Sequence, residues 1–135
     1  MTYPLSKIEN LHVHTVAKLK AIGVRTTDAL LDAARTPKAR KELASRIGAT
    51  EKQVLDWAKQ ADYMRVPGIG SGKNGLLRAA GVTTVRELAM RNPKRLAEAM
   101  KDANSKRKLV DILPSERSLE QLIERAKKLP PKITY

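Results

Sequence analysis

The feature that most constrains how this 135-residue chain can fold is an internal repeat. When residues 65–88 are placed under residues 7–30, a constant offset of 58 positions aligns apolar residues with apolar residues and glycine with glycine. The match resumes after a two-residue slip, where RTPK at 35–38 aligns with RNPK at 91–94. Two copies of one supersecondary unit are the simplest explanation of such a pattern. The chain is therefore predicted to contain two similar halves.

Signals for the start and the end of helices recur in both halves. A capping side chain stands before a proline that suits the first helical position at Thr36-Pro37 and at Asn92-Pro93. Glycines that favour the left-handed backbone of a helix C-terminus are Gly23, Gly48 and Gly81. Capping boxes, in which two side chains satisfy backbone N–H groups reciprocally, are predicted at Thr50/Gln53, Thr84/Glu87 and Ser118/Gln121.

These signals predict an all-α protein, because no stretch alternates as a β-strand requires. About nine short helices are expected, near 13–22, 27–34, 37–47, 51–63, 72–80, 84–91, 93–103, 105–112 and 118–129. The last of them is strongly amphipathic and is followed by Pro130-Pro131, which ends the helix and leaves a short extended tail. The predicted halves are residues 1–63 and 64–135, packed around one shared core.

The charge of the chain points to a polyanionic partner. Lys and Arg number 27 against 14 Asp and Glu, a net charge of +13. Up to Arg65 there are twelve basic and seven acidic residues, and beyond it fifteen and seven, so the excess is spread along the chain. The alternative is that the positive charge serves only to keep the protein soluble.

Composition also excludes several kinds of site. The chain has no Cys, which rules out disulfides, thiolate metal sites and cysteine nucleophiles. No apolar run is long enough for a signal peptide or a transmembrane helix, so a cytoplasmic protein with no membrane partner is expected. His12 and His14 have no evident third ligand and are interpreted as surface or turn residues, and Trp57 is predicted to be a core residue.

The segment VPGIGSGK at 66–73 is the most informative motif. It resembles the helix-hairpin-helix motif in its hydrophobic-x-Gly-hydrophobic-Gly form, in which two glycines permit a tight turn and the residue between them enters the core. In that family the amides after the turn bind a phosphate of the nucleic-acid backbone, largely without regard to base sequence. The resemblance implies a backbone-binding site made of Gly68, Ile69, Gly70, Ser71, Gly72 and Lys73, with Arg65 and Arg78 flanking it. The alternative is a turn that only connects two helices.

The corresponding loop of the first half departs from this motif. Asn10 and His12 occupy the two glycine positions, and Glu9 places a negative charge where a phosphate would approach. Asn tolerates the left-handed backbone, whereas His adds bulk. The first copy is therefore predicted to be mainly architectural.

The second loop also partly matches two glycine patterns found in nucleotide-binding enzymes, but the surrounding sequence excludes both. GSGKNG at 70–75 matches the bare G-x-G-x-x-G pattern, but a helix is expected before it where a dinucleotide fold needs a strand. GIGSGKN at 68–74 has one residue too few for a P-loop, and Asn stands where Ser or Thr would hold magnesium. Asp102 and Asp111 are single carboxylates, interpreted as ion-pair partners of Lys106, Arg107 or Lys108. No enzyme, cofactor, metal or small-molecule substrate is predicted.

The chain from Lys7 to Tyr135 is similar to an uncharacterised domain-of-unknown-function family of small tandem helix-hairpin-helix proteins. The similarity rests on both hairpins and on the segments TPKARKEL, LDWAKQADYMRVPGIG, GVTTVRELAMRNP and LPSERSLEQLIERAKKLPP. It implies an all-α fold of two helix-hairpin-helix repeats, with additional short helices packed as one compact unit. The family itself implies no activity, and the hairpin motif is what implies a non-catalytic protein that binds the nucleic-acid backbone. Duplex DNA is expected in preference because the chain has too few aromatic residues to stack on single-stranded bases. The alternative function is an interaction scaffold for an acidic protein.

Overall fold

The computed structural model describes residues 2–70 and 73–135 and divides the chain into two compact units. The first unit comprises residues 1–65 together with the C-terminal segment 130–135, and the second comprises residues 66–129. Within the described residues every regular element is a helix, so the predicted all-α class is confirmed. One isolated bridge joins Pro4 and Thr26. That the two halves pack around one shared core remains a prediction.

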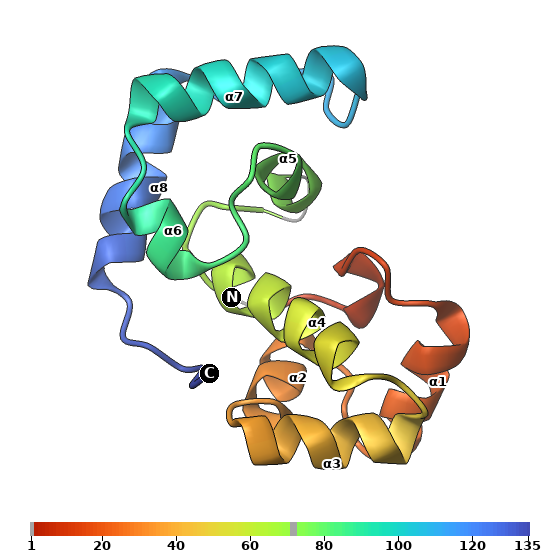
Figure 1. Cartoon of the computed structure of the whole chain (residues 1–135). Helices are drawn as coiled ribbons and strands as arrows, with labels where there is room; N and C mark the ends of the chain where they lie inside the picture. The colour runs from red at the N-terminus through yellow and green to blue at the C-terminus, as the bar shows by residue number, and fades with distance from the viewer. Residues whose placement is uncertain (1, 71–72) are drawn as a thin grey trace. The chain divides into compact units, whose positions relative to one another are not determined.

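The first unit holds a short 3-10 helix and four α-helices (Figure 1). Their bounds are η1 Leu5–Lys7, α1 Val13–Ala21, α2 Thr27–Ala33, α3 Pro37–Ile47 and α4 Glu51–Met64. The second unit holds α5 Lys73–Ala79, α6 Val85–Ala89, α7 Pro93–Lys106 and α8 Glu116–Lys128. The 3-10 helix was not predicted.

The two units use the same order of helices and the same pairs of packed helices. In the first unit α4 packs against α2 and α3, and in the second α8 packs against α6 and α7. Contacts between α1 and α3 likewise correspond to contacts between α5 and α7. The starts of α2 and α6 differ by the offset of 58 seen in the sequence, and those of α3 and α7 by 56.

Helix caps mostly follow the sequence signals. At the start of α4 both halves of the capping box form, with Gln53 N–H donating to Thr50 Oγ1 over 3.1 Å and Thr50 N–H donating to Gln53 Oε1 over 2.9 Å. At the start of α6, Thr84 accepts from Glu87 N–H, but the Glu87 carboxylate accepts from Thr83 N–H instead of the cap residue. All three predicted helix-ending glycines have positive φ.

The last helix was predicted near 118–129 and is found at Glu116–Lys128, but the capping box predicted at Ser118/Gln121 was wrong. The N-cap of α8 is Ser115, whose Oγ accepts from Ser118 N–H over 3.1 Å, so Ser118 lies within the first turn. Ser118 directs its own hydroxyl back to Ser115 O and forms no capping box with Gln121.

The helix predicted near 105–112 was also wrong. Helix α7 runs on to Lys106, and the segment after it is irregular. The cause is Asn104, whose Oδ1 accepts from Leu109 N–H and Val110 N–H and whose amide donates to Val110 O. Because this one side chain bonds the backbone groups that a new helix would need, it folds the chain into a loop.

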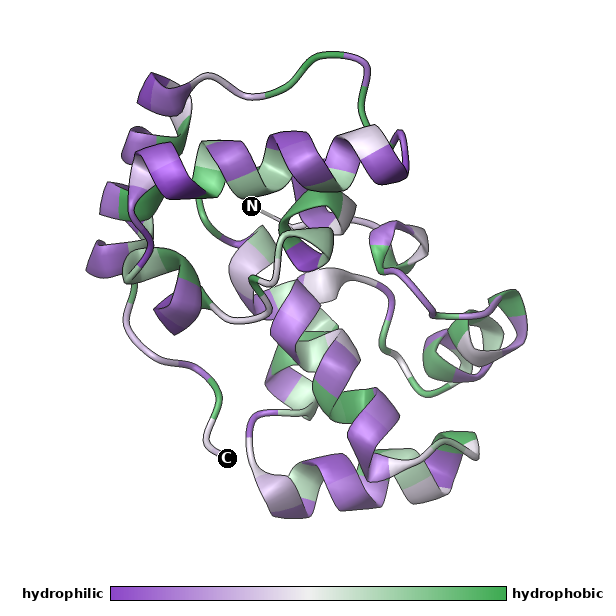
Figure 2. Ribbon diagram, turned by 45° about the horizontal axis from the view of Figure 1, so that its top comes forward, coloured by the Kyte–Doolittle hydropathy of each residue, from purple (hydrophilic) through white to green (hydrophobic). Residues whose placement is uncertain are grey.

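The apolar sides of the helices form the buried interior. Figure 2 shows hydrophobic and hydrophilic residues alternating along the helical ribbons, as in amphipathic helices. Leu30, Leu88, Val54 and Leu119 are fully buried, and they come from helices with corresponding positions in the two units. Trp57 is 3% exposed, which confirms that it is a core residue.

The C-terminal segment is extended, as predicted, and is bonded to the first unit. Thr134 N–H donates to Arg35 O over 2.9 Å, and the Arg40 guanidinium donates to both Thr134 O and Ala34 O. Arg40 is 4% exposed, and this burial lowers the pKa of its guanidinium. The segment therefore completes the first unit although α8 precedes it in the chain.

Candidate functional site

The turn at 66–70, which precedes α5, has the backbone that the glycine motif requires. Gly68 and Gly70 have φ of 87° and 66°, in the left-handed region that side chains other than glycine rarely adopt. Ile69 between them is fully buried, as predicted. The buried Ile69 and the two glycines therefore fix the turn, and they hold its backbone at the surface.

The two glycines have different surroundings. A Cβ at Gly68 would collide with the guanidinium of Arg125 and would lie 3.7 Å from Leu122 Cδ2. A Cβ at Gly70 would meet no atom of the described residues within 4 Å. Gly68 thus makes room for an arginine of α8, whereas Gly70 leaves open space above the backbone.

Two cationic side chains donate to neighbouring carbonyls of this turn. Lys73 Nζ donates to Gly68 O over 3.1 Å, and the Arg125 guanidinium donates to Pro67 O over 2.9 Å. Lys73 was included in the site predicted from the sequence at this turn, but Arg125 was not. Lysine has three N–H donors and arginine five, so one bond to a carbonyl leaves donors on each that can contact an anion.

The other predicted residues are placed as follows. Arg65 bonds groups of the first unit, with its Nε 2.6 Å from Asp62 Oδ1 and its guanidinium donating to Pro130 O over 2.6 Å. Its side chain is only 9% exposed, so it does not face an external ligand. Arg78 lies in the last turn of α5 and is half-buried. Ser71 and Gly72 lie outside the described residues.

The Asp62 carboxyl that holds Arg65 is itself largely withdrawn from solvent. Burial raises the pKa of Asp62, and the hydrogen bond and the charge of Arg65 oppose that rise. Arg65 therefore compensates a buried carboxylate, which accounts for its position.

The turn of the first unit has different chemistry at the same positions. Asn10 has a positive φ of 65°, and its equivalent Gly68 has one of 87°. His12 has a φ of −69° and occupies the N-cap position of α1 without a side-chain cap bond. Gln60 of α4 donates to Glu9 O over 3.1 Å and accepts from Glu9 N–H over 2.8 Å. Trp57 Nε1 donates to Asn10 O over 3.2 Å. Neutral side chains that are themselves buried thus hold this turn.

The carbonyls that receive these bonds are equivalent in the two units. Glu9 and Asn10 become Pro67 and Gly68 at the offset of 58. The side chain that reaches the first carbonyl of each pair also has an equivalent position, because Gln60 and Arg125 correspond when α4 is aligned with α8 at an offset of 65. At that offset the N-caps Thr50 and Ser115 coincide. This second alignment is the sequence signal that would have identified Arg125.

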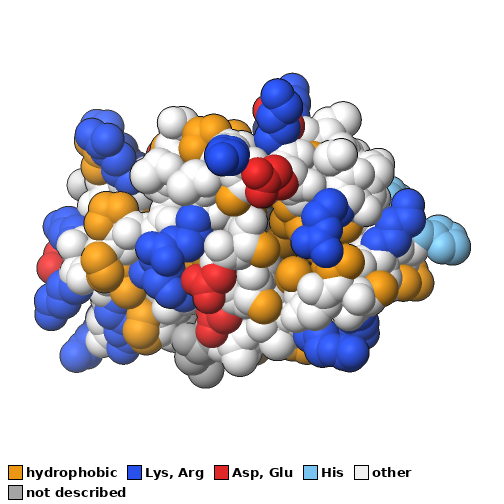
Figure 3. All heavy atoms as spheres, turned by 90° about the horizontal axis from the view of Figure 1, so that it is seen from below, with side chains coloured by type: hydrophobic (Ala, Val, Ile, Leu, Met, Phe, Trp, Pro, Cys, Tyr) orange, Lys and Arg blue, Asp and Glu red, His pale blue; other side chains and the backbone are white. Residues whose placement is uncertain are grey.

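Charge alone does not mark out the site. The first unit carries thirteen basic and seven acidic residues and the second fourteen and seven, so their net charges of +6 and +7 are nearly equal. Figure 3 shows Lys and Arg side chains in several separate groups, with apolar and acidic side chains between them. What distinguishes the second turn is therefore the identity of its donors.

Other candidate sites do not gather in the described residues. Among these residues no three His, Asp or Glu side chains come together as a metal site requires, and no helix is both long and apolar enough to cross a membrane. Asp102 and Asp111 pair with Lys106 and Lys108 over 3.3 and 3.5 Å, which confirms their interpretation as ion-pair partners.

Comparison with known proteins gives a family but no activity. The family model described as Domain of unknown function (DUF4332) matches residues 9–129. No curated protein and no solved structure matches the chain.

Proposed function

We propose, from the premise that the chain belongs to the family described as Domain of unknown function (DUF4332), that it is a non-catalytic protein that binds the phosphate backbone of duplex DNA without sequence preference. We interpret both interhelical turns as helix-hairpin-helix units, of which only the second serves binding. The proposed contacts are the backbone at 68–70 and the side chains of Lys73, Arg78 and Arg125.

The observation that carries this proposal is the change of donor at equivalent carbonyls. Gln60 and Trp57, which are neutral and buried, hold the first turn, whereas Lys73 and Arg125 hold the second. A turn needs no cation to satisfy a carbonyl, as the first one demonstrates. The cations at the second turn therefore require another explanation, and phosphate oxygens are the partners that lysine and arginine bind most often on DNA.

The open backbone at Gly70 supports the same role. Because no atom of residues 2–70 or 73–135 lies within 4 Å of the place where a Cβ would stand, the described part of the chain leaves room for a phosphate to approach the peptide there. Contacts of this kind do not read bases, which accounts for the lack of sequence preference. The proposed role is binding alone and assigns no residue to catalysis.

A salt series with a labelled duplex of about two helical turns tests the proposal. Each phosphate contact releases counterions, so log K is expected to fall linearly with log[salt], by about 0.9 per contact. Gly70→Glu should weaken binding about tenfold, since it puts a carboxylate where the phosphate would lie. Gly70→Gln is the matched control, because glutamine has the same length as glutamate and the same strain at a positive φ but adds no charge.

Two results would overturn the proposal. One is a wild-type protein that does not bind the duplex at low salt. The other is a Gly70→Glu variant that binds as tightly as Gly70→Gln. A protein that binds poly-glutamate but not the duplex would favour the scaffold for an acidic partner.

A further inference from the structure

The exposed side of α8 is divided along its length into a basic half and an acidic half. Leu119, Leu122, Ile123 and Ala126 are buried, which leaves the rest of the helix surface facing outward. Residues spaced four apart on a helix lie on one side. The basic half consists of Arg117, Arg125 and Lys128 with the neutral Gln121, and the acidic half of Glu116, Glu120 and Glu124, with Lys127 beside them.

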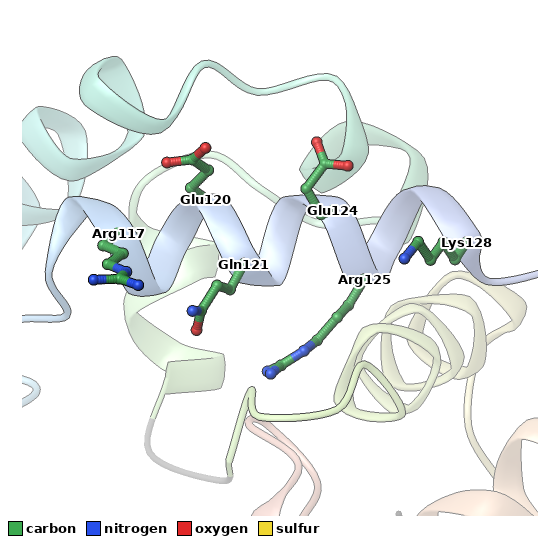
Figure 4. Close-up of a pocket in the computed structure, with 6 residues that line it drawn as sticks. All are labelled: Arg117, Glu120, Gln121, Glu124, Arg125 and Lys128. Carbon is green, nitrogen blue, oxygen red and sulfur yellow. The ribbon is translucent and has the colours of Figure 1, made fainter.

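The basic half is the one next to the second turn. Arg125 donates to Pro67 O, which fixes this side of α8 against residues 67–70. Figure 4 shows Gln121 and Arg125 pointing towards the turn, while Glu120 and Glu124 point the opposite way. An open hollow of about 400 Å³ runs along α8, and Glu120 and Glu124 line it together with Arg117, Gln121, Arg125 and Lys128.

The equivalent helix of the first unit lacks this division. At the offset of 65, Arg117, Gln121, Arg125 and Lys128 correspond to Lys52, Asp56, Gln60 and Tyr63 of α4. Gln60 and Tyr63 are buried there, whereas Arg125 and Lys128 are exposed. The basic half is thus confined to the unit whose turn is held by cations.

We infer that the basic half of α8 is a second line of contact for the DNA backbone, an inference that rests on the proposed function. One strand runs from the turn at 67–70 along α8 to Arg117, and the acidic half repels the duplex from the other side of the helix. Arg117 and Arg125 are eight residues apart, about 12 Å along the helix axis. Phosphates follow one another every ~3.4 Å along the axis of each strand, so the row spans several of them.

Charge reversal at two positions of α8 tests the inference on the full chain with the same labelled duplex. Arg117→Glu removes a cation from the basic half, and Lys127→Glu makes the same change of charge beside the acidic half, where Lys127 pairs with Glu124 over 3.0 Å. Arg117→Glu should lower the affinity about tenfold and reduce the salt slope by about 1. Lys127→Glu should change the affinity less than about threefold.

Unfolding of the variants does not explain the expected difference in DNA affinity between Arg117→Glu and Lys127→Glu. A carboxylate in the first turn of a helix interacts favourably with the helix dipole, whereas one in the last turn does not, so Lys127→Glu is the more destabilising of the two variants. Circular-dichroism melts of both variants check this. Equal losses of affinity in the two variants, or none in Arg117→Glu, would overturn the inference while leaving the proposed function in place. A wild-type protein that does not bind the duplex would overturn both.

Discussion

The two interhelical turns of this chain carry equivalent pairs of carbonyls in different chemical surroundings. In the first turn a buried glutamine and tryptophan of α4 donate to Glu9 and Asn10. In the second turn an arginine of α8 and a lysine of α5 donate to Pro67 and Gly68. A repeated structure can therefore keep its geometry while the donors at one copy change from neutral and buried to cationic and wholly or partly exposed. The first turn stabilises the fold, and the second is free to acquire a ligand.

The largest expected effect is at Trp57. Trp57→Ala should lower the free energy of unfolding by about 3–5 kcal/mol, because it removes a large buried side chain. Trp57→Phe keeps most of the packing but leaves Asn10 O without its donor, so about 1–2 kcal/mol should be lost. Urea unfolding followed by circular dichroism measures both. A Trp57→Phe variant as stable as the wild type would show that the bond to Asn10 does not hold the first turn.

The next largest effect on stability is expected at Gln60, and it is compared with that at its equivalent, Arg125. Gln60→Ala removes the two hydrogen bonds that this side chain makes to the N–H and C=O of Glu9 and should cost about 2 kcal/mol. Arg125→Ala removes an exposed side chain and should change the stability by less than about 0.5 kcal/mol. The same urea titrations decide the matter, and equal losses would mean that both turns are architectural.

A smaller effect is expected at the residues with positive φ. Gly68→Ala should cost about 1–2 kcal/mol, because alanine is strained at this φ and its Cβ would displace the Arg125 guanidinium. Asn10→Gly relaxes the same backbone conformation in the first turn and should change stability by less than about 0.5 kcal/mol. Thermal unfolding monitors both variants. Equal stability of Gly68→Ala and the wild type would indicate that Arg125 need not lie over the glycine.

The smallest effect is expected when the missing glycine is restored to the first turn. His12→Gly should leave the affinity for duplex DNA within about twofold of the wild type, because Gln60 and Trp57 still hold this turn and no cation is added. Fluorescence anisotropy at low salt provides the measurement. A clear gain in affinity would mean that glycine, and not the donor, distinguishes the two turns.

Sequence patterns were sufficient to predict those features that depend on residues close together in the chain. The helix caps at Thr36, Thr50 and Asn92 and the burial of Ile69 and Trp57 depend on neighbouring residues or on helical periodicity. The loop at 107–115 did not follow the pattern, because Asn104 bonds the backbone beyond α7 instead of continuing the helix.

The parts of the site that sequence reasoning missed depend on contacts between distant segments. Arg125 is 58 residues from Pro67, and its equivalence to Gln60 requires an offset different from that of the turns. Arg65 adjoins the motif in sequence, yet it bonds Asp62 and the carbonyl of Pro130, which follows the last helix. Neither contact could be deduced from local spacing.

The most direct test of the central claim is the salt dependence of DNA binding by the double variant Lys73→Ala/Arg125→Ala. If the two cations of the second turn contact phosphates, the slope of log K against log[salt] should fall by about 2 while the free energy of unfolding changes by less than about 1 kcal/mol. An unchanged slope, or a loss of stability as large as that of Gln60→Ala, would contradict the claim that the cations of the second turn serve a ligand and not the fold.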